Sequence, residues 1–121
     1  LGAAEHILLE GNSRVILCER GIVAPHTHRA SSRFLLDIQA VPALQEVTHL
    51  PVIVDPSHAT GRKDLIRPLA KASFAAGACG VMVEYHPEPE HARSDAPQAI
   101  DHDTLWQIAA DQGLVGETEL K

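Results

Sequence analysis

VIVDPSHATGRKD, residues 52–64, is the stretch on which the fold depends. Its apolar residues run without a polar interruption into Asp55, Pro56 and His58, and a glycine-containing turn and a helix start follow. A strand that is apolar at every position is typical of a parallel strand covered on both faces. We therefore predict a parallel strand that ends in a carboxylate and an imidazole, which is how α/β proteins place reactive groups at the carboxyl edge of a sheet. The alternative is a strand whose last residues merely begin a polar loop.

The same arrangement occurs twice more along the chain. Residues 15–18 (VILC) lead into Glu19 and Arg20, and residues 81–84 (VMVE) lead into His86. The apolar spacing predicts helices before the first strand and after every strand, over residues 2–10, 37–47, 64–76 and 103–112. Helices and strands that alternate without a hairpin predict right-handed crossovers and a parallel α/β sheet.

The predicted helices have recognisable ends and faces. We expect Asp37 to cap the second helix, which should bury Val47 among its apolar residues. We expect Pro68 near the first turn of the third helix, where a missing N–H costs least. In the first helix, an apolar face that includes Ala4 and Ile7 is available for packing.

Length and composition limit the possible functions. At 121 residues the chain is about one small domain, well short of the roughly 250 residues of a complete eight-stranded barrel. A net charge of −6 argues against nucleic-acid binding, because no basic surplus is available to neutralise phosphates. No apolar run approaches the ~18 residues of a membrane helix, and no signal-peptide pattern leads the chain. We therefore expect a soluble, cytoplasmic protein without a membrane partner.

The two cysteines and the first residue add two expectations. Cys18 and Cys79 have no metal-binding spacing and lie in or beside apolar runs, so we expect two buried, reduced thiols; a disulfide is the alternative. The chain begins at Leu1 in what resembles the middle of a helix, so we expect a piece of a longer polypeptide.

If the three strands are neighbours, their polar C-terminal residues meet at one edge of the sheet. An imidazole and two carboxylates from different loops suit a divalent cation with mixed nitrogen and oxygen ligands. We predict as metal ligands His58, Glu84 and Asp95. The alternatives are a His58 ring satisfied by loop backbone and an Asp95 that only caps a turn. Glu84 is harder to explain otherwise, because a carboxylate at the end of an apolar strand must be paired or bound to a cation.

Other polar residues are candidates near the same edge. Arg20 follows a strand end, so its guanidinium is placed to hold a phosphate or carboxylate; an ion pair with Glu19 is the alternative. His26 and His28 have ligand-like spacing in the long connection after the first strand, but solvated side chains are the preferred interpretation.

Four stretches together resemble a known enzyme family. They are ILCERG (16–21), LPVIVDPSHATGRKDLIRPL (50–69), AAGACGVMVEYHPEPEHARSD (75–95) and PQAI (97–100). In this order they closely resemble the C-terminal part of the type I 3-deoxy-D-arabino-heptulosonate 7-phosphate (DAHP) synthases, which are related to the 3-deoxy-octulosonate 8-phosphate synthases. The match runs over nearly the whole chain, and the combination is far more specific than any single motif.

The resemblance implies a fold and a reaction. The fold is a (β/α)8 TIM barrel, of which residues 1–121 would supply about the last three strand–helix units of a single catalytic domain. The reaction is the metal-dependent, aldol-like condensation of phosphoenolpyruvate with erythrose 4-phosphate, the first step of the shikimate pathway towards the aromatic amino acids. The implied cofactor is a divalent metal ion, Mn²⁺ or similar. The implied partners are the two substrates, and we also expect a homo-oligomer.

The resemblance also implies roles for individual residues. His58 matches the His of the DPSH motif, Glu84 the Glu of a VEVH-like motif and Asp95 the Asp of an SDGPQ-like motif, all of which bind the metal. Arg20 matches the Arg of the CERG motif that contacts phosphoenolpyruvate, and we assign catalysis to His58 and Arg20. The remaining residues assigned to substrate binding are Glu19, Arg33 and Asp55.

Parts of the family pattern are missing or altered. The family's fourth metal ligand, a Cys, belongs to a strand upstream of Leu1, and Cys18 does not align with it. Residues 22–36 depart from the usual sequence, although Arg33 stands in the matching place, and this leaves the acceptor sugar open. The alternatives are a 3-deoxy-octulosonate 8-phosphate synthase that uses arabinose 5-phosphate and a non-catalytic barrel remnant that acts as a binding module. From these 121 residues alone we expect negligible turnover.

Overall fold

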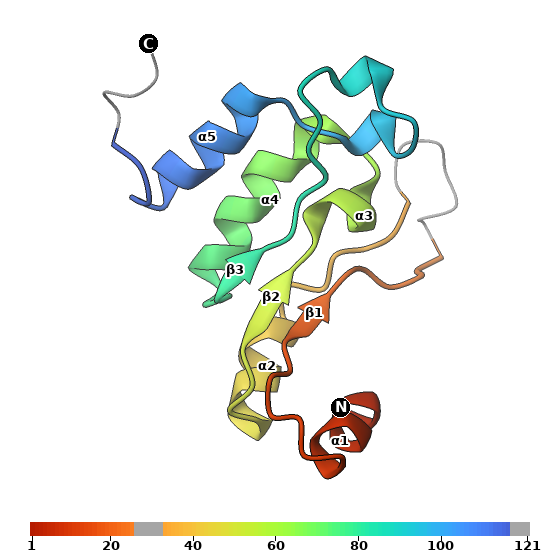
Figure 1. Cartoon of the computed structure of the whole chain (residues 1–121), viewed down its shortest axis with the longest axis vertical. Coiled ribbons are helices and arrows are strands. Elements are labelled where there is room, and N and C mark those ends of the chain that lie inside the picture. Colours follow the sequence, from red (N-terminus) through yellow and green to blue (C-terminus); the bar gives the residue numbers. More distant parts are fainter. Residues whose placement is uncertain (26–32, 117–121) are drawn as a thin grey trace.

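Three short parallel strands form the centre of the molecule (Figure 1). The structure is a computed structural model that describes residues 1–25 and 33–116, so the predictions for His26 and His28 lie outside the described residues. The strands are β1 (Leu17–Glu19), β2 (Val52–Val54) and β3 (Gly80–Val81). They are hydrogen-bonded in the order β1-β2-β3, and both pairings are parallel. The predicted parallel sheet is therefore confirmed.

Helices precede and follow the strands in the predicted alternation. They are α1 (Gly2–Leu9), α2 (Ala40–Val47), α3 (Pro56–Thr60), α4 (Lys63–Ala75) and α5 (His102–Asp111), with 3₁₀ turns η1 (Pro89–His91) and η2 (Ala96–Gln98) before α5. Figure 1 shows α1 and α5 at opposite ends of the molecule. Within residues 1–25 and 33–116, no helix is both long enough and apolar enough to cross a membrane.

One face of the sheet holds the core. A first cluster joins α2 to the sheet through Val41, Val52, Val54 and Ala78. A second cluster joins α4 and α5 through Ile66, Ala70, Ile100 and Ile108, with Val81 of β3 packed against it. Val54 and Val81 are register partners, so both clusters lie on the same face. This apolar burial is the main force that holds the helices against the sheet.

The other face of the sheet is open among the described residues, so the prediction of strands covered on both faces is wrong for this chain. Strand side chains alternate between faces, which places Cys18 and Ile53 opposite the core. Cys18 is exposed, Ile53 is only half-buried, and Met82, just after β3, is 45% exposed. The reason is that α2 and α4 both pack on the core face.

Two predicted element ends differ from the structure. The third strand was expected over residues 81–84, but β3 ends at Val81 because the following backbone turns to a new partner: the Ile100 N–H donates to the Glu84 carbonyl at 2.9 Å. Asp37 does not cap α2; the cap is Gln39, and the Asp37 N–H instead donates to the Glu19 carboxylate at 3.2 Å.

Two predictions about helix positions are also wrong. Val47 is 66% exposed, because it lies at the end of α2 beyond the reach of the sheet. Pro68 lies inside α4, past its first turn, because the helix starts at Lys63. In α1 only Ala4 is buried, while Ile7 is exposed.

Both cysteines are free thiols, but the expectation that they are buried is wrong. Cys18 and Cys79 are exposed. Cys18 lies on the open face of β1, and Cys79 directly precedes β3, the last strand of the sheet. The apolar residues beside each cysteine belong to strands of the sheet, but they do not bury the cysteine itself.

Candidate metal centre

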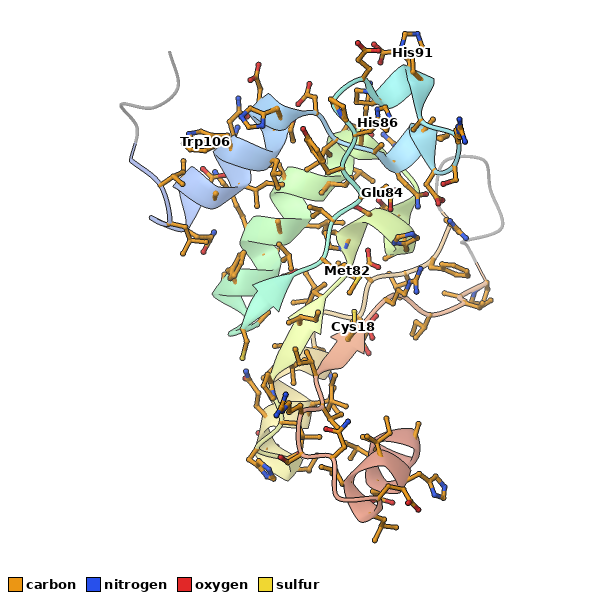
Figure 2. All side chains as sticks on the ribbon, viewed as in Figure 1. Cys18, Met82, Glu84, His86, His91 and Trp106 are labelled. Atoms are coloured by element: carbon orange, nitrogen blue, oxygen red, sulfur yellow. The ribbon has the colours of Figure 1, made fainter. Side chains whose placement is uncertain are left out.

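Three side chains from different segments meet beyond the carboxyl ends of the strands. Donor atoms of His58, Glu84 and Asp95 all lie within 4.8 Å of one another, and all three residues are half-buried. His58 belongs to α3, Glu84 follows β3, and Asp95 directly precedes η2. Figure 2 shows Glu84 past the strand ends, with His86 and His91 farther along the same connection. The sequence predicted these three residues as a group, and the structure brings them together.

The short helix α3 sets the position of His58. Asp55 is its N-cap, Pro56 occupies its first turn, and Gly61 ends it with a positive φ of 66°. The Asp55 carboxylate accepts the backbone N–H of His58 at 2.9 Å and lies 2.8 Å from its ring Nδ1. The other ring nitrogen, Nε2, lies 3.9 Å from the Glu84 carboxylate. The imidazole is therefore held with Nε2 towards the group. This helix was not predicted, although Asp-Pro at its start and a following Gly are helix-end signals.

Ser57 sets the position of Glu84. The Ser57 hydroxyl is fully buried and accepts the backbone N–H of Glu84 at 3.0 Å. This bond joins the end of β2 to the connection after β3, where the sheet ladder has already stopped. Sequence reasoning gave Ser57 no role, because the contact links residues 27 positions apart.

Asp95 is held in an unusual backbone conformation. Among the described residues it is the non-glycine residue with a positive φ, 56°, a region that Asp and Asn tolerate better than most residues. Its carboxylate accepts the side-chain N–H of Gln98 at 2.9 Å, and Gln98 is buried. Asp95 does precede a turn, as the alternative proposed, but its side chain also belongs to the three-residue group.

The chemistry of the group fits a divalent cation. It offers one imidazole nitrogen and two carboxylates, a mixed donor set of the kind that first-row divalent metals accept. In the part of the chain that the structure describes, no Arg or Lys forms a salt bridge with Glu84 or Asp95. Two neighbouring carboxylates without a cationic partner repel each other, and a bound cation would remove that repulsion.

The residues predicted to bind substrate lie next to this group. The Arg20 guanidinium lies 3.3 Å from the Asp55 carboxylate, and the Arg20 side chain is 60% exposed, so it is accessible to an anion. The Arg33 guanidinium donates to the Gln98 side chain at 3.4 Å and lies over the Phe34 ring. Arg20 and Arg33 thus each contact a residue, Asp55 or Gln98, that itself contacts one of the candidate metal ligands.

Glu19 and Asp55 have mainly structural partners. The Glu19 carboxylate accepts the Gly21 N–H at 2.8 Å and the Asp37 N–H, which fixes both ends of the connection after β1. Gly21 has a φ of 95°, and a Cβ there would lie 2.8 Å from Phe34. Asp55 is fully buried. Substrate contact by Glu19 and Asp55 stays a prediction.

The Cys18 thiol interacts electrostatically with Asp55 but is not one of the three grouped side chains. Desolvation raises the pKa of its thiol, and the negative charge of Asp55 raises that pKa further, against the opposing effect of Arg20. Cys18 is not part of the three-residue group.

The fold and this group define a class: a parallel α/β protein with a candidate metal centre beyond the carboxyl ends of its strands. Residues 1–117 match the model of the DAHP synthetase I family. The chain belongs to this family of enzymes.

Named relatives and solved structures agree with the family. Over 106 residues the chain is 48% identical to a phospho-2-dehydro-3-deoxyheptonate aldolase from Thermotoga maritima, which covers 88% of this chain and 30% of that protein. It is 34% identical over 101 residues to a 2-dehydro-3-deoxyphosphooctonate aldolase from Rhodopseudomonas palustris, covering 74% of this chain and 33% of that protein. A truncated DAHP synthase structure from Thermotoga maritima matches with a TM-score of 0.85 at 45% identity, covering 92% of this chain and 41% of that one. The chain thus spans about a third of the length of these curated relatives.

Proposed function

We propose that this chain is the metal-binding, C-terminal part of a DAHP synthase. The observation that carries the proposal is the meeting of His58, Glu84 and Asp95 beyond the strand ends of a chain that belongs to this family. The proposed reaction condenses phosphoenolpyruvate with erythrose 4-phosphate to DAHP and phosphate. The DAHP synthase name of the Thermotoga maritima relatives supports this choice.

The proposed complete fold is a (β/α)8 barrel in which β1, β2 and β3 are neighbouring strands. In such a barrel one strand face meets the helices and the other faces the barrel interior. The open face with Cys18, Ile53 and Met82 supports this arrangement, since it would be the interior face. Active sites of these barrels lie at the carboxyl ends of the strands, where the three-residue group lies.

The residues of this chain have separate proposed tasks. His58, Glu84 and Asp95 hold a divalent cation, which when bound polarises the aldehyde oxygen of the acceptor sugar as a Lewis acid. Arg20 holds an anionic group of phosphoenolpyruvate by charge-assisted hydrogen bonds, and Arg33 is placed to do the same for a phosphate. Fixed positive charges at these positions also stabilise negative charge that develops during the condensation.

For the acceptor sugar, we propose erythrose 4-phosphate over arabinose 5-phosphate. The identity of 48% to the heptonate aldolase exceeds the 34% to an octonate aldolase, which supports erythrose 4-phosphate. Arabinose 5-phosphate remains the second candidate because several octonate aldolases are also similar to the chain.

A chimera tests the proposal. The part of the Thermotoga maritima DAHP synthase that precedes its match to this chain would be fused to residues 1–121, and phosphoenolpyruvate consumption would be followed with Mn²⁺ and each sugar. We expect turnover with erythrose 4-phosphate, none by residues 1–121 alone, and a loss of at least about 100-fold in a His58→Ala chimera. A folded chimera without turnover on either sugar contradicts the proposal. The binding-module alternative predicts no metal affinity, so a chimera that shows neither turnover nor a difference in Mn²⁺ binding between wild type and His58→Ala favours that alternative.

A further inference from the structure

Two buried polar side chains lie behind the candidate metal ligands. Asp55 is 0% exposed and contacts His58, and Gln98 is 3% exposed and contacts Asp95. Each of them also contacts an arginine: Arg20 lies 3.3 Å from Asp55, and Arg33 lies 3.4 Å from Gln98. Burying an amide or a carboxylate is unfavourable unless it is hydrogen-bonded, and these contacts supply the hydrogen bonds that the two buried side chains need.

The contacts of Asp55 determine which nitrogen of His58 is free. The 2.8 Å contact joins Nδ1 to a carboxylate that already accepts the His58 backbone N–H, and we assign Nδ1–H as the donor of this second hydrogen bond. The lone pair is then on Nε2, the nitrogen that faces Glu84. Asp55 also accepts the backbone N–H of His58, which fixes the residue at both its backbone and its ring.

Gln98 holds the carboxylate of Asp95 in a similar way. Its amide N–H donates to the Oδ1 carboxylate oxygen of Asp95 at 2.9 Å. Its amide oxygen accepts from Arg33, which fixes the orientation of the amide. The Gln98 bond therefore restricts rotation of the Asp95 carboxylate.

We propose that Asp55 and Gln98 are positioning residues, which orient the His58 ring and the Asp95 carboxylate for one divalent cation. This inference rests on the proposed function for the cation itself. Groups that hold metal ligands from behind typically change metal affinity by about 10- to 100-fold when they are removed. Their connection to Arg20 and Arg33 places the cation site and the two arginines in a fixed geometry relative to each other.

The test combines two readouts on the 121-residue chain with Asp55→Asn, Gln98→Met and, as a matched control, Ser73→Ala. Ser73 is also buried and polar, but its hydroxyl donates to the Leu69 carbonyl inside α4, away from the site. Nitrogen-15 NMR of the histidine rings reports the His58 tautomer without any metal. Mn²⁺ titration followed by electron paramagnetic resonance reports affinity, and circular dichroism checks the fold of every variant.

The inference predicts a specific pattern. Wild type and Ser73→Ala carry the His58 proton on Nδ1, and Asp55→Asn shifts it towards Nε2. The Mn²⁺ dissociation constant rises about 10- to 100-fold in Asp55→Asn and about 10-fold in Gln98→Met, and is unchanged in Ser73→Ala. If Asp55→Asn does not fold, Gln98→Met alone decides through its affinity.

The outcomes that overturn the inference differ from those that overturn the proposed function. Folded variants that bind Mn²⁺ as tightly as the wild type overturn the inference, as does a wild-type His58 protonated on Nε2. A wild-type chain that does not bind Mn²⁺ contradicts the proposed function, and the tautomer readout then still decides the role of Asp55.

Discussion

At the residue scale, the four residues of the DPSH sequence, 55–58, have different structural roles. Asp55 orients the ring of His58, Ser57 holds the backbone of Glu84, and His58 offers its Nε2 to the group. Pro56 has no N–H to lose at the start of α3 and fixes its first turn. Four consecutive residues therefore build one side of the candidate centre.

Replacing Ser57 tests one of these contacts by stability. In Ser57→Ala the partly buried Glu84 N–H loses its acceptor, so we expect the free energy of unfolding to fall by about 1 kcal/mol. Ser73→Ala is the matched control, because a Ser that bonds back to the carbonyl four residues earlier adds little to a helix. Urea unfolding of both variants measures the difference. Equal stability of Ser57→Ala and wild type would show that the contact is unimportant.

The candidate ligands were predictable from the sequence, but their supports were not. His58, Glu84 and Asp95 follow from strand ends and from the family motifs, and the structure places them together. Whether they bind a metal stays a prediction. Ser57 and Gln98 could not be assigned, because their partners depend on how the connection after β3 folds back beside β2.

At the element scale, an ionic cluster joins α4 to α5. The Arg67 guanidinium donates two hydrogen bonds to the Asp111 carboxylate, at 2.7 and 3.0 Å, and Lys71 lies 3.2 Å from the same group. The pKa of Asp111 is lowered to about 2, mainly by the hydrogen bonds from Arg67 and to a smaller extent by Lys71. The bidentate geometry is the kind that makes an ion pair between helices effective.

This cluster predicts a pH-dependent stability. The folded-state pKa of Asp111 lies below its ordinary value of 3.8, so its contribution is complete above about pH 4 and is lost as the pH falls from 3.8 towards 2. We expect Asp111→Asn to be about 1 kcal/mol less stable than wild type at pH 6, and we expect this difference to shrink as the pH falls through about 2. Thermal unfolding across this pH range measures the difference. A stability difference that is the same at pH 6 and at pH 2 would show that the loss does not come from the Asp111 charge.

Element order was predictable, whereas element ends were not. Hydrophobic spacing gave the alternation of helices and parallel strands, which the structure confirms. It did not give the early end of β3, because the bond between Ile100 and Glu84 forms only after the chain has folded back. It also did not give α3, which is too short to show a helical period.

At the scale of the whole molecule, one face of the sheet is left open by the residues that the structure describes. The prediction of strands covered on both faces was drawn from their continuous apolar sequence, yet Cys18 and Met82 are exposed and Ile53 is only half-buried. Such strands are typical of α/β proteins with both faces covered. The continuous apolar sequence thus fits the proposed complete barrel, in which both faces of these strands would be covered. The open face is seen because the structure contains only residues 1–121 of that proposed fold.

The central claim is that distant segments of this chain create one cation site. His58, Glu84 and Asp95 come from three segments that only the folded sheet brings within 4.8 Å. Anomalous X-ray diffraction from crystals soaked in Mn²⁺ tests this claim most directly. We predict one strong manganese peak within bonding distance of all three side chains, absent in crystals of His58→Ala. A peak elsewhere, or no peak at saturating Mn²⁺, would contradict the account.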